Sequence, residues 1–188
     1  MTPILATLLA AGLLLAAPLR AAPPEIPVEE PAGFRLTDYR APTPPGLAGA
    51  TTLDTGAVRA LLERGGALPI YVQKLDRSSL PGAPWLLSKP FRQIPGSVWL
   101  PNVGLGAPDP ATLDWFARHL ERLTGGDRAH GLLFYCLSDC WLSWNTAKRA
   151  VLLGYTRVHW YPAGVDGWAE AGLPTEDANP LPGPQPAP

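Results

Sequence analysis

Hydrophobic positions along the chain switch between short continuous apolar runs and stretches in which they recur every three or four residues. The short runs predict buried strands, and the helical spacing predicts amphipathic helices. The predicted strands are 68–72, 94–100 after an initial turn, 132–135 and 157–161. The predicted helices are 55–64, 110–123 and 141–153, with a last helical turn over 166–171. This alternation predicts an α/β fold, a mostly parallel sheet with helices on both faces.

Capping residues define the ends of two of these helices. Asp54 can cap the first, and Asp109 followed by Pro110 is a strong start signal for the second. Glycine pairs follow both predicted helices and predict their ends. On the second helix, the side chains expected to face inward are Leu113, Phe116, Leu120 and Leu123. Residues 74–93 contain scattered prolines and are predicted to be a loop.

The first 22 residues resemble an export signal. Leu5 to Ala17 is apolar but too short for a permanent membrane span, and small residues near Ala21 or Ala22 fit a cleavage site. An N-terminal membrane anchor is the alternative. We therefore expect a periplasmic protein with no membrane span after signal cleavage.

Prolines concentrate towards both ends of the remaining chain. This predicts a Pro-rich N-terminal extension over 23–50, one domain over 51–175 and a Pro-rich flexible tail over 176–188. The formal net charge is −1, which gives no electrostatic argument for a nucleic-acid partner.

The two cysteines of the chain, Cys136 and Cys140, lie at one predicted strand–helix junction. Free backbone N–H groups and the helix dipole favour a thiolate at such a junction. Cys136 is therefore the candidate nucleophile and Cys140 the candidate resolving thiol. An inert buried thiol at position 136 and a static structural disulfide are the alternatives, although so short a loop gains only about 2 kcal/mol from a crosslink.

Neighbouring residues complete the candidate site. The residues expected to form a substrate-binding loop with the cysteines are Leu137, Ser138, Asp139 and Trp141. Trp144 lies three residues after Trp141, so the two indoles share a helix face and can form a wall over the thiols, a partner contact or ordinary core packing. Lys148 can offset the charge of Asp139 or decorate a solvated surface. A metal site using both cysteines and His159 is a minor alternative, because no second ligand pair is clustered.

Four stretches in this order resemble the rhodanese-like domains, over about residues 52–174. They are Ile94-Pro-Gly-Ser-Val98, Phe134-Tyr-Cys136, Leu153-Gly-Tyr155 with Val158, and Gly164-Val-Asp-Gly-Trp168 with Ala171-Gly-Leu-Pro174. The run from Tyr135 to Ala150 is similar to the CXXCW-motif proteins associated with pyrroloquinoline quinone (PQQ)-dependent catabolism, although three residues separate the cysteines here. The resemblance implies a rhodanese-like fold and sulfur or thiol-redox chemistry.

Two departures from the sulfurtransferase pattern bear on the substrate. Asp139 stands where the anion-binding loop usually has glycine, and Trp141 stands in place of its arginine. Like-charge repulsion from Asp139 should disfavour thiosulfate, so ordinary thiosulfate:cyanide transfer is not expected.

The sequence thus favours an exported protein with a cysteine-based sulfur-transfer or thiol-redox role in quinoprotein-dependent catabolism, acting on small sulfur species or protein thiols without a cofactor. The alternative is a non-catalytic accessory that binds a quinoprotein dehydrogenase or its cytochrome through the tryptophan-rich face, with a structural disulfide between positions 136 and 140.

Overall fold

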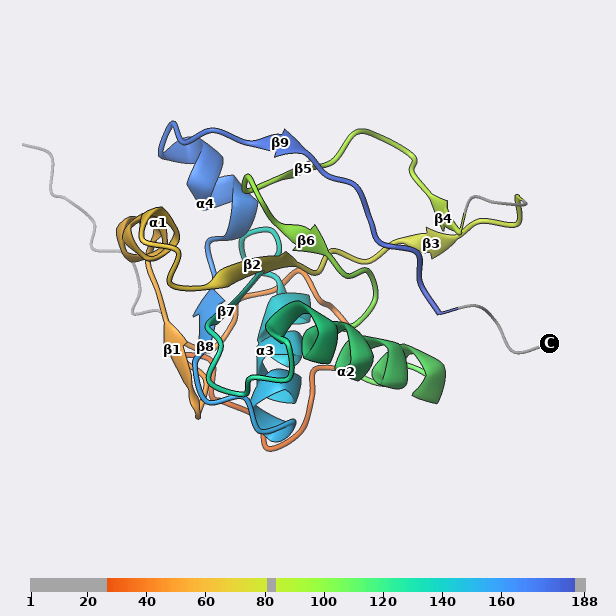
Figure 1. Ribbon diagram of the computed structural model, residues 1–188, viewed down its shortest axis with the longest axis horizontal. Coiled ribbons are helices and arrows are strands. Elements are labelled where there is room, and N and C mark those ends of the chain that lie inside the picture. The colour runs from red at the N-terminus through yellow and green to blue at the C-terminus, as the bar shows by residue number, and fades with distance from the viewer. Residues whose placement is uncertain (1–26, 81–83, 185–188) are drawn as a thin grey trace, which may run out of the picture.

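The computed structural model describes residues 27–80 and 84–184. Its centre is a five-stranded sheet in the order β1-β8-β7-β2-β6, in which every neighbouring pair is parallel. Its strands are β1 (Ala50–Thr52), β2 (Leu68–Tyr71), β6 (Val98–Trp99), β7 (Leu132–Tyr135) and β8 (Val158–Tyr161). β7 lies in the middle of the sheet, with β2 and β8 on either side of it (Figure 1).

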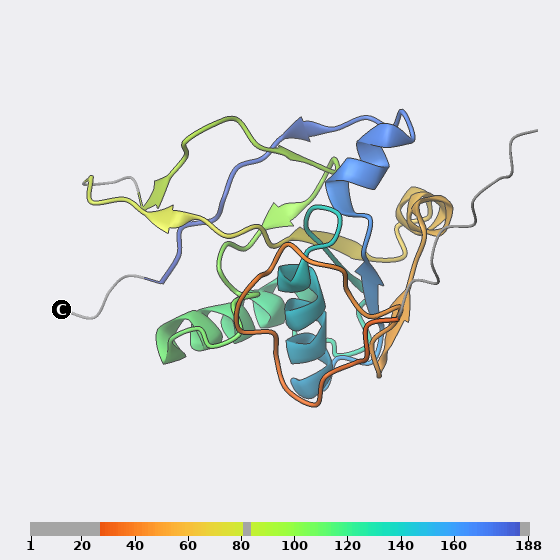
Figure 2. The ribbon, with the colours of Figure 1, turned by 180° about the vertical axis from the view of Figure 1, so that it is seen from behind.

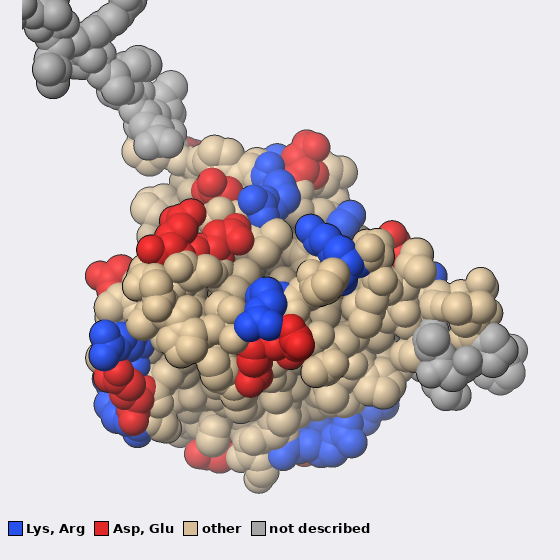
Figure 3. Space-filling view, turned by 90° about the horizontal axis from the view of Figure 1, so that it is seen from above, with Lys and Arg blue, Asp and Glu red and all other residues tan. Residues whose placement is uncertain are grey.

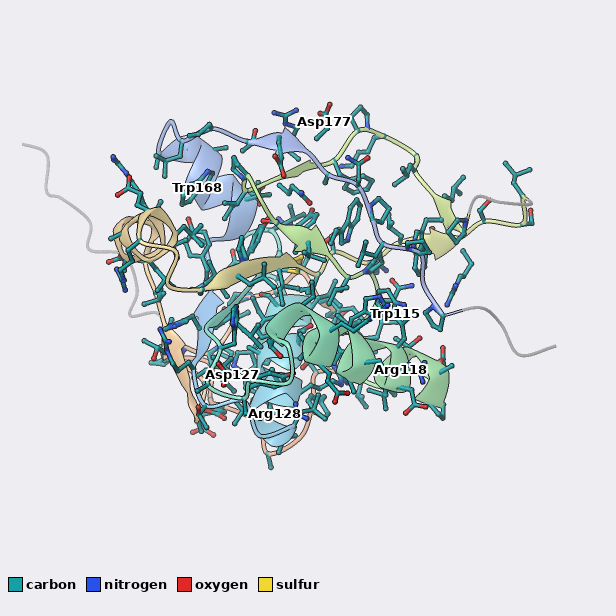
Figure 4. All side chains as sticks on the ribbon, in the orientation of Figure 1. Trp115, Arg118, Asp127, Arg128, Trp168 and Asp177 are labelled. Carbon is teal, nitrogen blue, oxygen red and sulfur yellow. A yellow bond between two sulfur atoms is a disulfide. The ribbon has the colours of Figure 1, made fainter. Side chains whose placement is uncertain are left out.

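Helices cover both faces of the sheet. They are α1 (Thr55–Glu63), α2 (Pro110–Thr124), α3 (Trp141–Leu152) and α4 (Gly164–Glu170). Helices α2 and α3 pack with Phe134 and Trp160 on one face, and α1 and α4 pack with Tyr135 and Tyr161 on the other. Trp115 on α2 and Trp168 on α4 mark these opposite sides in Figure 4. The α/β class and the parallel sheet with helices on both faces are confirmed.

The helix starts follow the predicted capping. The side chain of Asp54 accepts a hydrogen bond from the backbone N–H of Ala57, and that of Asp109 accepts one from Thr112. Gly125 ends α2 in the left-handed conformation, with φ 62°. One inward-facing prediction is wrong. Leu113 is 40% exposed, because the buried stripe of α2 runs through Thr112 and Phe116 instead.

Short strands occur in the predicted loop 74–93 and at the start of the predicted tail 176–188. β3 (Asp76–Arg77) pairs with β4 (Trp85–Leu86), and β5 (Arg92–Gln93) pairs with β9 (Glu176–Asp177). Beyond β9, the backbone N–H of Leu181 donates to the carbonyl of Trp99. The domain boundaries near residues 50 and 175 stay predictions.

The export signal over residues 1–22 lies outside the described part of the chain. Between residues 27 and 184, leaving aside 81–83, no helix has the length and apolar character needed to cross a bilayer.

Candidate functional site

The two cysteines flank a loop between the central strand and α3. Cys136 directly follows β7, Cys140 is the residue before α3, and the two form a disulfide with 6.1 Å between their Cα atoms. Parallel α/β sheets carry their ligand chemistry beyond the carboxyl ends of the strands, which is where this loop lies. Both cysteines are buried, Cys136 completely and Cys140 to all but 2% of its surface.

Tight backbone contacts fix the shape of this loop. Asp139 has a left-handed backbone, with φ 48°. On the other side of the loop, the N–H of Val165 at the start of α4 donates to the carbonyl of Cys136. Gly164 has φ 58° and lies so close that any side chain there would meet the backbone of Cys136 and Leu137. The end of β7, the loop between the cysteines and the start of α4 are therefore packed tightly against one another.

The backbone N–H groups at positions 138 and 141 already have partners within the protein. Both the N–H and the hydroxyl of Ser138 donate to the carboxylate of Asp166, at 3.0 and 3.1 Å. The N–H of Trp141, at the start of α3, donates to the carbonyl of Tyr39 at 2.9 Å. The carboxylate of Asp166 thus holds the loop where an external anion would be expected to bind.

A segment of the N-terminal region, residues 27–49, packs against the cysteine loop and α3; we call it the strap. Arg40 and Cys140 form an antiparallel β-bridge, and the N–H of Ala41 donates to the carbonyl of Asp139 at 3.1 Å. The guanidinium of Arg40 also lies 3.9 Å from the carboxylate of Asp166 and partly balances the negative charge of that carboxylate. Figure 2 shows the strap running across the outer face of α3.

Four side chains of α3 hold the strap by its backbone. The indole N–H groups of Trp141 and Trp144 donate to the carbonyls of Pro42 and Gly46, both at 3.1 Å. Asn145 is fully buried and bonds to Arg35 twice, through its amide nitrogen to the carbonyl and through its oxygen to the N–H. The ammonium group of Lys148 donates to the carbonyls of residues 31–33. These positions share one helix face.

The strap gives a structural role to residues predicted from sequence as site residues. Trp141 and Trp144 are buried between the core and the strap, and their rings pack edge to face with centroids 5.3 Å apart. Lys148 lies 4.8 Å from the Trp144 ring and is bound to strap carbonyls, so it does not pair with Asp139 in this structure. Of the predicted loop residues, Leu137 and Ser138 are partly buried and Asp139 is exposed.

Gln73 is a site residue that the sequence interpretation did not select. It follows β2, and its Oε1 lies 3.0 Å from the Sγ of Cys136. Its backbone carbonyl accepts a hydrogen bond from the indole N–H of Trp99. Asp166 and the strap were missed as well. Only the position of Gln73, after the strand beside β7, was a signal in the sequence.

Two buried tyrosines lie below the loop but are poor proton donors. Burial raises the pKa of Tyr71 well above its usual range, with a further contribution from Asp166 and an opposing one from Arg40. Burial likewise raises the pKa of Tyr135, although its hydroxyl is hydrogen-bonded to Ser97 and the N–H of Ile94. Both side chains therefore stay neutral at physiological pH and fix the strand end by packing.

The candidate metal site formed by the two cysteines and His159 is not assembled among the described residues. Within residues 27–80 and 84–184, no group of three His, Cys, Asp or Glu side chains is placed to hold a metal ion. His159 lies on β8, opposite Leu133 of β7, and both its ring nitrogens are buried without a hydrogen-bond partner in the described part of the chain.

His159 should make the protein less stable in mild acid. Burial, followed by Arg157 and Arg64, lowers its pKa below that of an unfolded histidine. The unfolded chain therefore takes up a proton first as the pH falls below about 6.5, and stability is lost down to the lower, folded pKa. We expect His159→Val to reduce the drop in melting temperature between pH 7.5 and 5.5. His130→Gln is the control, because His130 lies in the turn before β7, away from the His159 ring, and it should leave the drop unchanged. Equal drops in all three proteins would contradict this role.

Comparison with known proteins gives distant structural matches only. No family model matches the sequence, and neither does any curated protein sequence. A thiosulfate sulfurtransferase from Pseudomonas aeruginosa is 19% identical, with a TM-score of 0.44 over 70% of this chain and 21% of its own. The chain thus spans about a fifth of that protein.

Two smaller proteins are similar over more of their length. The polysulfide-sulfur transferase of Wolinella succinogenes is 18% identical, with a TM-score of 0.44 over 70% of this chain and 82% of its own. A human single-domain sulfurtransferase is 20% identical, with a TM-score of 0.39 over 64% of this chain and 96% of its own.

Proposed function

We propose that this is an exported, rhodanese-like protein whose Cys136–Cys140 pair performs sulfur-transfer or thiol-redox chemistry in the periplasm, in support of PQQ-dependent catabolism. The observation that carries the proposal is the pairing of the two sulfurs at the carboxyl end of the central strand. Export and the periplasm are inferred from the signal-like first 22 residues, and the quinoprotein link from the resemblance to the CXXCW-motif proteins.

The arrangement suits a two-step reaction with a persulfide. In the reduced protein, the Cys136 thiolate attacks the outer sulfur of R–S–SH, which forms Cys136–S–SH and releases R–S⁻. The Cys140 thiolate then attacks the inner sulfur, which forms the observed disulfide and releases HS⁻. The sum is R–S–SH plus two protein thiols giving R–SH, H₂S and the disulfide. A dithiol reductant returns the protein to its starting state.

Several charges and contacts argue against thiosulfate as the donor. The carboxylate of Asp166 already occupies the N–H and hydroxyl of Ser138, and the N–H of Trp141 is bound to the strap. A dianion at this loop would be repelled by that carboxylate, whose charge the guanidinium of Arg40, 3.9 Å away, offsets in part. Figure 3, which views the molecule from the side of α4, shows acidic and basic side chains interspersed on this face. A neutral or singly charged sulfur compound fits better.

Access to the pair requires the strap to move. Both cysteines are buried, and the segment around Arg40 pairs with the backbone of Cys140. The bridge joins one residue pair, so opening it locally leaves the bonds from Trp144, Asn145 and Lys148 to the strap in place and costs far less than unfolding the domain. Strap opening is therefore part of the proposed cycle.

Sulfide release from a low-molecular-weight persulfide tests the proposal. The reduced wild-type chain should release one sulfide per molecule in a single turnover. Cys140→Ser should take up sulfur but release sulfide at least about 100-fold more slowly, because no thiol remains to displace it. Cys136→Ser should do neither.

Ser88→Ala is the matched control, because Ser88 is exposed on the loop after β4, outside the cysteine loop and the strap. It should behave as the wild type. Equal sulfide release from wild type and Cys136→Ser would overturn the proposal.

The alternative is an accessory that binds a quinoprotein dehydrogenase or its cytochrome through the tryptophan-rich face. Trp141 and Trp144 are buried beneath the strap and hydrogen-bonded to it, so no observation on this structure favours that contact.

A further inference from the structure

A groove at the C-terminal end of α3 combines an apolar lining with a buried positive charge. It has a volume of about 370 Å³ and lies between the strap, α2 and the end of α3. Its apolar walls include Phe34, Phe116, Leu113 and Leu152. Small-molecule sites in proteins occupy about 300–1,000 Å³, so the groove can take a small ligand.

Arg149 is the one charged residue among those that line this groove. It is only 6% exposed, and its two terminal nitrogens donate to the carbonyls of Val103 and Gly106 at 3.0 and 2.9 Å. The guanidinium also stacks 4.1 Å from the centre of the Phe34 ring. Two carbonyls occupy two of its five N–H donors, which leaves three for other acceptors.

The charge of Arg149 has no counter-ion in the described part of the chain. None of the ion pairs among residues 27–80 and 84–184 includes it. Burial lowers its pKa to about 10, so the side chain is still charged at neutral pH and is held away from water at a cost. A carboxylate at this point would recover that cost and would also satisfy the remaining donors.

The groove rim is unusually apolar for a protein surface. Leu113 is 40% exposed, Leu152 69% and Leu153 39%, and all three line the groove. Clustered exposed leucines commonly indicate a ligand or partner surface. Here the leucines would cover the hydrocarbon portion of a ligand, while the guanidinium of Arg149 would favour a ligand with a negatively charged head group.

We propose that this groove binds small apolar monocarboxylates, with the carboxylate on the guanidinium of Arg149 and the hydrocarbon portion against the leucine rim. Amines and neutral alcohols of the same length would lack the ionic contact. The site lies apart from the cysteine loop and does not depend on its chemistry.

Calorimetric titration of the full chain at pH 7.5 with octanoate, octanol and octylamine tests the proposal. Octanoate should bind at least about tenfold more tightly than octanol, and octylamine should not bind. Leu113→Glu, at an exposed position where folding is not at risk, should weaken octanoate at least about tenfold by placing a like charge at the rim. Arg149→Met should abolish the preference of octanoate over octanol, provided that it melts cooperatively.

Leu86→Glu is the control, because Leu86 is also exposed, on β4, but lies outside the groove. It should bind octanoate as the wild type does. Equal affinities for octanoate and octanol, or equal weakening by Leu113→Glu and Leu86→Glu, would overturn the proposal even where Arg149→Met fails to fold.

Discussion

Asn145→Asp is expected to detach the strap and to lower the free energy of unfolding by about 3–5 kcal/mol. The amide nitrogen of Asn145 donates to the carbonyls of Arg35 and Gly104, both at 2.9 Å, and the residue is fully buried. An aspartate has nearly the same shape but puts a carboxylate oxygen against two carbonyl oxygens. Two lost hydrogen bonds and an unpaired buried charge account for the expected size of the effect.

The release of the strap should be visible at the disulfide. We expect the Cys136–Cys140 bond of Asn145→Asp to be reduced by a mild dithiol at least about tenfold faster than that of the wild type, below the melting temperature. Asn179→Asp makes the same chemical change at an exposed position and should alter neither stability nor reduction rate. A wild-type reduction rate in a destabilised Asn145→Asp protein would show that the strap does not control access.

Gly164→Ala is expected to destabilise the protein by about 2–5 kcal/mol and to displace the cysteine loop. A methyl group there would lie 2.6 Å from the carbonyl carbon of Leu137 and closer still to the carbonyl oxygen of Cys136. Both contacts are with backbone, so no side chain can rotate away. The cost combines overpacking with the strain of a left-handed alanine, φ being 58°.

Gly172→Ala separates these two contributions. Gly172 has a similar backbone, with φ 71°, but a methyl group there would touch nothing within 4 Å. It should therefore cost only the conformational strain, about 1–2 kcal/mol in chemical denaturation. If both variants lost the same stability, the close packing of α4 against the cysteine loop would not be what holds the loop in place.

Most of the sheet and the four helices were predictable because their signals are local, whereas the edge strand β1 was not predicted. Capping by Asp54 and Asp109 defined two helix starts, and continuous apolar runs defined β2, β7 and β8. The position of Cys136 at the end of a central strand followed from the same pattern. Leu113 was placed wrongly because a leucine near a helix start was counted with the buried stripe, whereas Thr112 occupies that position.

The surroundings of the disulfide were not predictable, because they depend on contacts between distant parts of the chain. Proline-rich sequence has no periodicity, and nothing in residues 27–49 shows that their carbonyls accept hydrogen bonds from α3. The contact between Ser138 and Asp166 spans 28 residues, and that between Gln73 and Cys136 spans 63. The sequence left the tryptophans and the lysine after the cysteines between a role at the thiols and ordinary packing or solvation, and it did not show that they hold the strap.

The central claim is tested most directly by the intact mass of the full chain. The protein is first reduced with a mild dithiol and then treated with a persulfide donor, and its thiols are alkylated before the mass is measured at each stage. The account predicts two alkylated thiols after reduction and a return to the unalkylated disulfide mass after the donor. In Cys140→Ser it predicts one extra sulfur atom retained on Cys136. A disulfide that neither reductant nor donor alters below the melting temperature would contradict the account and indicate a static crosslink.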